Sequence, residues 1–178
     1  FGRGGEEAEA LAAAGIACDT VPGISAAQGA AASAGIPLTH RDHAAMLVFA
    51  TGHLQGEEGE RTVALDWAAL ARPHQTVVIY MGVGTLPIIC AQLIAHGLPA
   101  STPAAMIERA TLPGQRSIVG TLQTLPQLSV AYGVNPPALV MIGDTVALHA
   151  RIGSSAEVLT GFPAVVDAAS PQALACTA

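Results

Sequence analysis

Hydrophobic positions in the first part of the chain follow helical spacing in some segments and form short continuous runs in others, which is typical of an α/β protein. Residues 6–14 consist of Ala, Glu and Leu, all strong helix formers, and Gly15 is expected to end this helix. The short apolar segment 16–21 predicts a strand, which a Pro-Gly pair interrupts. Ser25 then precedes a run of small residues and predicts a capped helix over 26–34.

The remainder of the chain contains nearly continuous apolar runs, which are typical of strands buried on both faces. The expected strands are 45–50, 76–80, 104–108, 115–120 and 138–142, and the expected helices are 66–71, 85–96 and 121–130. Thr85 is the expected N-cap of its helix. A Leu-Pro-Gly turn before the fourth strand predicts that this strand runs antiparallel to the third.

A polar connector at residues 37–42 separates the two groups of elements, and we place a domain boundary just after it. Residues 1–44 are then the end of a first α/β domain, and residues 45–150 are a second one. The Ala-rich segment 151–178 loses the periodic pattern and is expected to be a poorly ordered tail. Because the chain begins with Phe1 and a charged run, we expect a piece of a longer protein whose first domain is incomplete here.

Composition narrows the possible functions. The 178 residues are 51% hydrophobic and 11% charged, with a formal net charge of −6 and no lysine. Seven scattered arginines do not form the basic stripe that nucleic-acid binding requires, so we expect no nucleic-acid partner. No apolar run reaches the roughly 18 residues of a membrane span. The three distant cysteines predict reduced thiols in the cytoplasm rather than disulfides or a zinc site.

Three short motifs could contact a ligand, and each also has a purely structural reading. The glycine-rich FGRGGEE at 1–7 precedes a helix, where backbone N–H groups can hold an anion or simply allow a tight turn. In VPGISAA at 21–27, Ser25 and Ala26 could meet a ligand, although Ser25 is equally explained as a helix cap. Met81, in YMG at the end of a buried strand, could pack on a flat ligand or fill the core.

The six histidines give no recognisable metal-binding pattern. His40 and His43 are three residues apart on an expected loop, so we expect no metal site. His53, after a Thr-Gly pair at the end of a strand, is the best candidate for a functional imidazole, and a structural role is equally open. No nucleophile elbow or pair of catalytic carboxylates is visible.

Taken together and in this order, the motifs FGRGGEE, VPGISAA, AGIPLTHRD, TGH, YMG and PALVMIG resemble those of the tetrapyrrole methyltransferases, and among them the branch acting on uroporphyrinogen III. The resemblance covers residues 1–150. It implies a tetrapyrrole methylase fold of two α/β domains with S-adenosylmethionine in the cleft between them. It further implies a cytoplasmic homodimer that transfers two methyl groups to C2 and C7 of uroporphyrinogen III, giving precorrin-2 for sirohaem or cobalamin synthesis.

The resemblance also assigns roles to individual residues. The cofactor-contacting positions fall on Ser25, Ala26, Met81, Ala110, Pro137 and Ala138. Arg3 matches a substrate-side arginine, and arginine is the side chain expected on a substrate with eight carboxylates. Arg41 is a second such candidate, although an ion pair with Asp42 explains it equally well. The acid and base candidates of the family precede Phe1, so we expect no catalytic residue in this chain and no activity from it alone.

Two other functions stay open at this point. One is a methyltransferase of the same fold that acts on a later precorrin, against which PLTHRD and YMG argue. The other is a non-catalytic dimerisation or binding module. The sequence upstream of Phe1 would separate this module from an enzyme.

Overall fold

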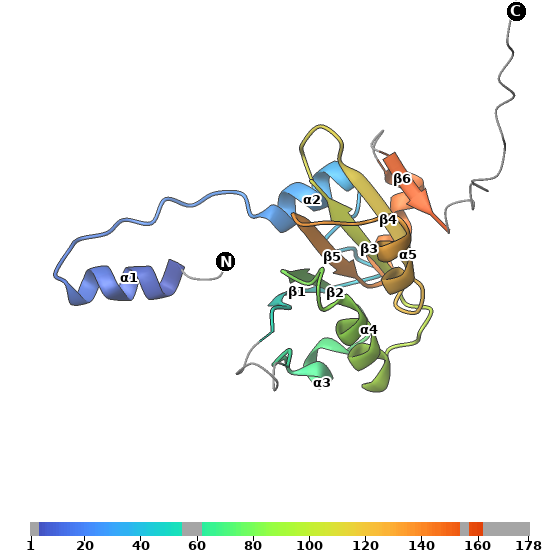
Figure 1. The fold of residues 1–178 in the computed structure, drawn as a ribbon, viewed down its shortest axis with the longest axis horizontal. Coiled ribbons are helices and arrows are strands. Elements are labelled where there is room, and N and C mark those ends of the chain that lie inside the picture. Colours follow the sequence, from blue (N-terminus) through green and yellow to red (C-terminus); the bar gives the residue numbers. More distant parts are fainter. Residues whose placement is uncertain (1–3, 55–61, 154–156, 162–178) are drawn as a thin grey trace, which may run out of the picture.

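The computed structural model describes residues 4–54, 62–153 and 157–161. Its centre is a mixed six-stranded sheet with the order β1-β2-β5-β3-β4-β6 (Figure 1). The strands are β1 Met46–Thr51, β2 Gln75–Tyr80, β3 Pro103–Glu108, β4 Arg116–Thr121, β5 Ala138–Ile142 and β6 Glu157–Thr160. The pairs β1·β2 and β4·β6 are parallel, whereas β5 runs antiparallel to both of its neighbours and β3 antiparallel to β4.

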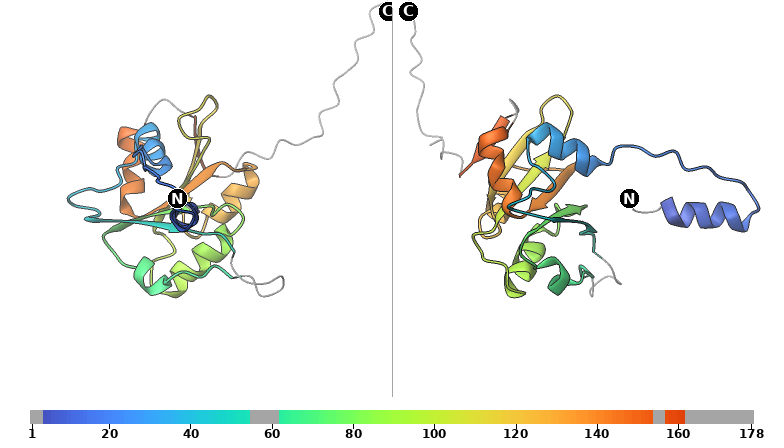
Figure 2. Two further views of the ribbon diagram at one scale, coloured as in Figure 1. Left: turned by 90° about the vertical axis from the view of Figure 1, so that its left-hand side faces the viewer. Right: turned by 180° about the vertical axis from the view of Figure 1, so that it is seen from behind.

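Helices cover both faces of this sheet (Figures 1 and 2). The described helices are α1 Gly4–Ala13, which stands apart from the sheet, and α2 Ala26–Ala34, α3 Trp67–Leu70, α4 Leu86–Ala95, α5 Leu125–Ala131 and α6 His149–Ile152, with a 3-10 turn at Asp144–Leu148. Successive strand residues face opposite sides: Val77 and Ile79 pack with α4 and α5, and Val78 between them packs with α2. The sheet is therefore the shared wall of two hydrophobic cores.

Helix α2 approaches the sheet closely because its inner face is made of alanines. Ala27, Ala30 and Ala34 are fully buried against β2, β3 and β5. At the other end of the helix, Gly35 adopts a φ of +64°, and a Cβ there would lie 2.4 Å from the Ile152 carbonyl oxygen. Only glycine fits this contact, so the end of α2 is fixed against α6.

Most of the expected elements are confirmed. The helices over 6–14, 26–34 and 85–96 and all five strands from 45 onward are found within a few residues of their expected bounds, and β3 and β4 are antiparallel. Ser25 caps α2 through a capping box with Gln28. Thr85 precedes α4 but makes no side-chain cap; its hydroxyl donates to the Gly52 carbonyl at 2.5 Å instead.

Three expectations differ from the structure. Residues 16–21 form no strand, because no described neighbour pairs with them and the side chains of Ile16 and Val21 are exposed. The helix expected over 121–130 begins only at Leu125, because Thr121 continues β4 and its N–H bonds to the Thr124 hydroxyl. After residue 148 the structure adds α6 and a strand, β6, that the sequence pattern does not indicate.

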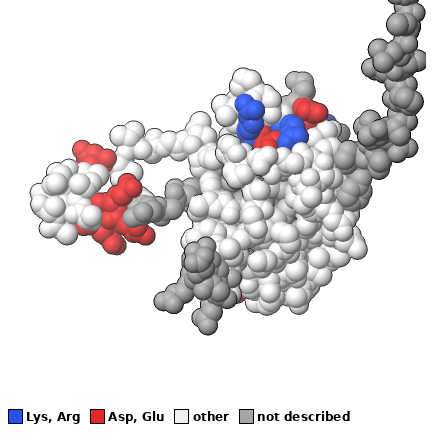
Figure 3. Space-filling view, viewed as in Figure 1, with Lys and Arg blue, Asp and Glu red and all other residues white. Residues whose placement is uncertain are grey.

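Helix α1 stands clear of the sheet at the end of an extended segment (Figure 1). It buries no residue, and its acidic side chains make the most acidic region visible in Figure 3. None of the helices that the structure describes has the length and apolar character needed to cross a bilayer.

A largely buried ion pair joins the end of β3 to the start of β4. The Glu108 side chain, 7% exposed, accepts from the Arg116 guanidinium at 2.6 Å across the β3·β4 pair. The other carboxylate oxygen accepts the Asn135 N–H at 2.8 Å, and Arg116 also donates to the Tyr132 carbonyl at 3.1 Å. This network ties the segment before β5 to β3 and β4.

Removing one partner of this pair should destabilise the protein strongly. We expect Arg116→Met to lower the free energy of unfolding by about 3 kcal/mol, because the buried carboxylate loses its counter-charge. Glu108→Met/Arg116→Met should recover much of that loss, since an apolar pair leaves no buried charge. Urea unfolding measures both. A loss no larger than that of Arg72→Met, which changes an exposed arginine, would contradict the role given to the pair.

Candidate functional site

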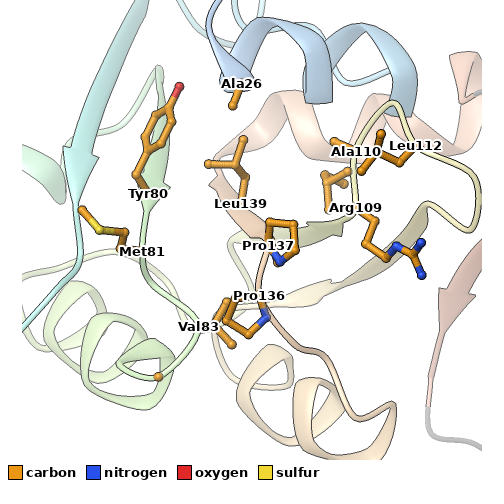
Figure 4. Close-up of a pocket in the computed structure, with 13 residues that line it drawn as sticks. Ala26, Tyr80, Met81, Val83, Arg109, Ala110, Leu112, Pro136, Pro137 and Leu139 are labelled. Atoms are coloured by element: carbon orange, nitrogen blue, oxygen red, sulfur yellow. The ribbon is translucent and has the colours of Figure 1, made fainter. Parts of the chain in front are cut away.

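A pocket of about 500 Å³ opens where β2 and β3 end and β5 begins, beside the N-terminus of α2 (Figure 4). Because β5 is antiparallel to both neighbours, its first residues lie next to the last residues of β2 and β3. The lining is formed by Ala26, Tyr80, Met81, Val83, Gly84, Ile107, Arg109, Ala110, Leu112, Pro136, Pro137, Ala138 and Leu139. Four separate segments of the chain thus form one largely apolar cavity.

The start of α2 forms one wall, and hydrogen bonds fix it there. The Ser25 hydroxyl accepts the Gln28 N–H, and the Tyr80 hydroxyl, from the end of β2, accepts the Ala27 N–H at 3.0 Å. The Tyr80 ring is itself held edge-on by Phe49 on β1. Among the described residues, the Ala26 N–H has no hydrogen-bond partner, so the pocket wall offers a backbone donor at a helix N-terminus.

The turn after β2 presents Met81 to the pocket. Met81 adopts a φ of +54° and is 55% exposed, which is uncommon for a long apolar side chain. Tight packing behind the turn fixes this conformation: a Cβ on Gly52 would lie 2.8 Å from Ile79, and a Cβ on Gly82 would lie 3.2 Å from it. Strained conformations of this kind concentrate at functional sites.

The loop between β3 and β4, residues 109–115, forms the opposite wall. Arg109 has a φ of +51° and Thr111 a φ of +65°, with Ala110 between them. The Arg109 N–H donates to the Pro137 carbonyl at 2.9 Å and joins this loop to the start of β5. Of the described lining residues, Arg109 alone carries a charge, and Figure 4 shows its guanidinium directed away from Pro137, over the loop.

The structure brings five of the six expected cofactor-contacting residues together. Ala26, Met81, Ala110, Pro137 and Ala138 all line this pocket. The sixth, Ser25, lies next to Ala26, but its hydroxyl accepts the Gln28 N–H in the capping box.

The other candidates lie elsewhere. Arg41 is exposed in the turn closed by the His40–Ala44 bridge, and within the described part of the chain it forms no ion pair with Asp42. Arg3 lies outside the described residues. His53 is exposed and is not part of the pocket lining.

Several lining residues were not expected from the sequence. Tyr80 belongs to the YMG motif but received no role of its own, and Arg109 stands directly before Ala110, so a neighbouring candidate residue was the only available signal. Leu139, beside Ala138, has the sequence pattern of a buried strand residue and nothing more. Their convergence depends on the order of strands in the sheet, which local sequence patterns do not contain.

Known proteins are similar in sequence to this chain over most of its length. A family model of tetrapyrrole (corrin/porphyrin) methylases matches residues 1–126. The siroheme synthase of Nitrosospira multiformis is 54% identical over 152 residues, which are 85% of this chain and 31% of that protein. The siroheme synthase of Gluconacetobacter diazotrophicus is 56% identical over 146 residues, 82% of this chain and 30% of that protein. The chain thus spans about a third of these relatives.

Solved structures share the fold. Uroporphyrin III C-methyl transferase from Thermus thermophilus superposes with a TM-score of 0.70 at 33% identity, over 83% of this chain and 60% of that one. A structure of the Thermus enzyme complexed with S-adenyl homocysteine gives 0.67 at 34% identity, over 83% of this chain and 62% of that one. The match to the family model over most of the sequence shows that the chain belongs to the tetrapyrrole (corrin/porphyrin) methylase family.

Proposed function

We propose that this chain supplies the S-adenosylmethionine pocket of a methyltransferase that methylates uroporphyrinogen III at C2 and C7, giving precorrin-2. The observation that carries the proposal is the meeting of five family-matched positions, from four separate segments, in one pocket. The Thermus relative, solved with S-adenyl homocysteine, supports the choice of cofactor. The siroheme synthases among the relatives support a role in sirohaem synthesis.

The pocket suits this cofactor in size and chemistry. A volume of about 500 Å³ lies within the range of small-molecule sites, roughly 300–1,000 Å³. Its apolar walls fit an adenosyl group, and the free Ala26 N–H offers a donor at a helix N-terminus. When bound, S-adenosylmethionine supplies a methyl group on a positively charged sulfur.

The residues of this chain would then act mainly by positioning. Methyl transfer is an in-line displacement, so the protein must hold donor and acceptor carbon at a fixed distance and angle. Met81 and Leu139 would exclude water from one side, and the small Ala26 and Gly84 would let a ligand reach the backbone. Arg3 and Arg41 would pair with substrate carboxylates. The complete protein would work as a homodimer in the cytoplasm.

The reaction itself is tested with the complete gene product. Incubation with uroporphyrinogen III and S-adenosylmethionine should yield a product that has gained two methyl groups, identified by mass spectrometry and located at C2 and C7 by NMR. No methylation of uroporphyrinogen III, with turnover of a later precorrin, would favour the other branch of the family. No methylation of any tetrapyrrole would contradict the proposal.

Met81→Ala should weaken cofactor binding. Loss of a large apolar side chain from the pocket wall is expected to raise the Kd for S-adenosylhomocysteine about tenfold, as measured by calorimetry on the complete gene product. Met46→Ala is a matched control, because Met46 is 49% exposed on β1 and is not part of the lining. Equal affinity of the two variants would remove Met81 from the cofactor site.

Arg3→Ala should impair the substrate side of the reaction. We expect a KM for uroporphyrinogen III raised by about tenfold, because one charge-assisted pair to a carboxylate is lost, while the Kd for S-adenosylhomocysteine stays unchanged. Arg72→Ala, at an exposed position outside the pocket lining, is the control. Kinetics of Arg3→Ala equal to those of the control would exclude Arg3 from the substrate site.

A further inference from the structure

The loop over residues 109–115 carries an unusual feature that the proposed function does not use. Gln115 is 8% exposed, and its side-chain oxygen accepts the Thr111 N–H at 2.7 Å. Since the partner is an N–H, the amide oxygen must face it, and the amide nitrogen is left on the other side. That nitrogen is buried and has no partner within the described part of the chain.

An unpartnered buried amide nitrogen is unfavourable for stability, so its presence requires a reason. The reason lies at Thr111, which adopts a φ of +65°. This conformation is a clear outlier for a β-branched residue and persists only where surrounding contacts impose it. The Gln115 oxygen provides such a contact, because it binds the N–H of the strained residue itself.

The strained residue lies beside the pocket. Ala110, which lines it, is held between Thr111 on one side and Arg109 on the other, and the Arg109 N–H is bonded to the Pro137 carbonyl. The Thr111 methyl group lies 3.4 Å from the position that a Cβ on Gly29 of α2 would occupy. The loop is therefore bonded to the start of β5 and lies close to α2, two of the other three segments that form the pocket.

We infer that Gln115 is a positioning residue for the pocket: its buried amide oxygen holds Thr111 in the left-handed conformation and thereby sets the Ala110 wall against the ligand. This inference rests on the proposed function only in the identity of that ligand, S-adenosylmethionine. Gln115 does not line the pocket and is expected to touch neither cofactor nor substrate.

Gln115→Met tests this role, because methionine keeps the length of the side chain and removes the acceptor. In the complete gene product we expect the Kd for S-adenosylhomocysteine, measured by calorimetry, to rise about tenfold, as loss of a contact that maintains a left-handed residue implies. Gln75→Met is the matched control. Gln75 is also buried, at the opposite end of β2, and its amide donates to the Ala69 and Leu70 carbonyls. This control should lose stability but keep its affinity.

A second substitution separates positioning from general destabilisation. Glycine adopts a positive φ without strain, so Thr111→Gly in the Gln115→Met background should restore most of the affinity without replacing the lost hydrogen bond. Unchanged affinity in Gln115→Met, or a loss that Thr111→Gly does not restore, would overturn the inference. Failure of the unmodified protein to bind S-adenosylhomocysteine would instead overturn the proposed cofactor, so the two failures are distinguishable.

Discussion

The close approach of α2 to the sheet is the constraint on which the pocket depends. Larger side chains on the inner face of α2 would move the helix outward, because Ala27, Ala30 and Ala34 are already fully buried against the strands. The start of the helix would then no longer meet the Tyr80 hydroxyl, and Ala26 would leave the pocket wall. The small residues that look like simple helix formers in the sequence are thus what brings a helix N-terminus to the ends of β2 and β3.

The net charge of the chain does not by itself indicate how the proposed substrate would be bound. The chain carries a formal net charge of −6, and the proposed substrate is itself a polyanion. Under the proposed function, recognition of this substrate would rest on a few placed arginines acting against the overall charge. The pocket itself is nearly uncharged, which suits an adenosyl group, and the acidic residues visible in Figure 3 gather mainly on α1, away from the sheet.

Helices and strands that depend on residues close in the sequence could be predicted from it. Those that depend on pairing with segments distant in the sequence could not. Ser25 caps α2 through residues three positions away, and the buried strands carry their own apolar signal. Segment 16–21 has that signal too, but a strand requires a partner, and no described residue provides one. Strand β6 shows the reverse situation. Its sequence pattern is weak, but the segment forms a strand because it pairs with β4.

The same distinction holds for the candidate site. The family resemblance predicted cofactor contacts at Ala26, Met81, Ala110, Pro137 and Ala138, but only the insertion of β5 between β2 and β3 brings these residues together. The hydrogen bond between the Ala27 N–H and the Tyr80 hydroxyl joins residues 53 positions apart, so no local sequence pattern indicates it. Backbone strain at Thr111 is equally invisible, because threonine is not a residue type that favours a positive φ.

The central claim is that this pocket holds the cofactor, and a crystal structure of the complete gene product with S-adenosylhomocysteine tests it most directly. The ligand is predicted to lie between the start of α2 and the 109–115 loop, with the Ala26 N–H donating to it and the Met81 side chain in contact. Well-defined ligand density at any other place, with this pocket empty, would contradict the claim.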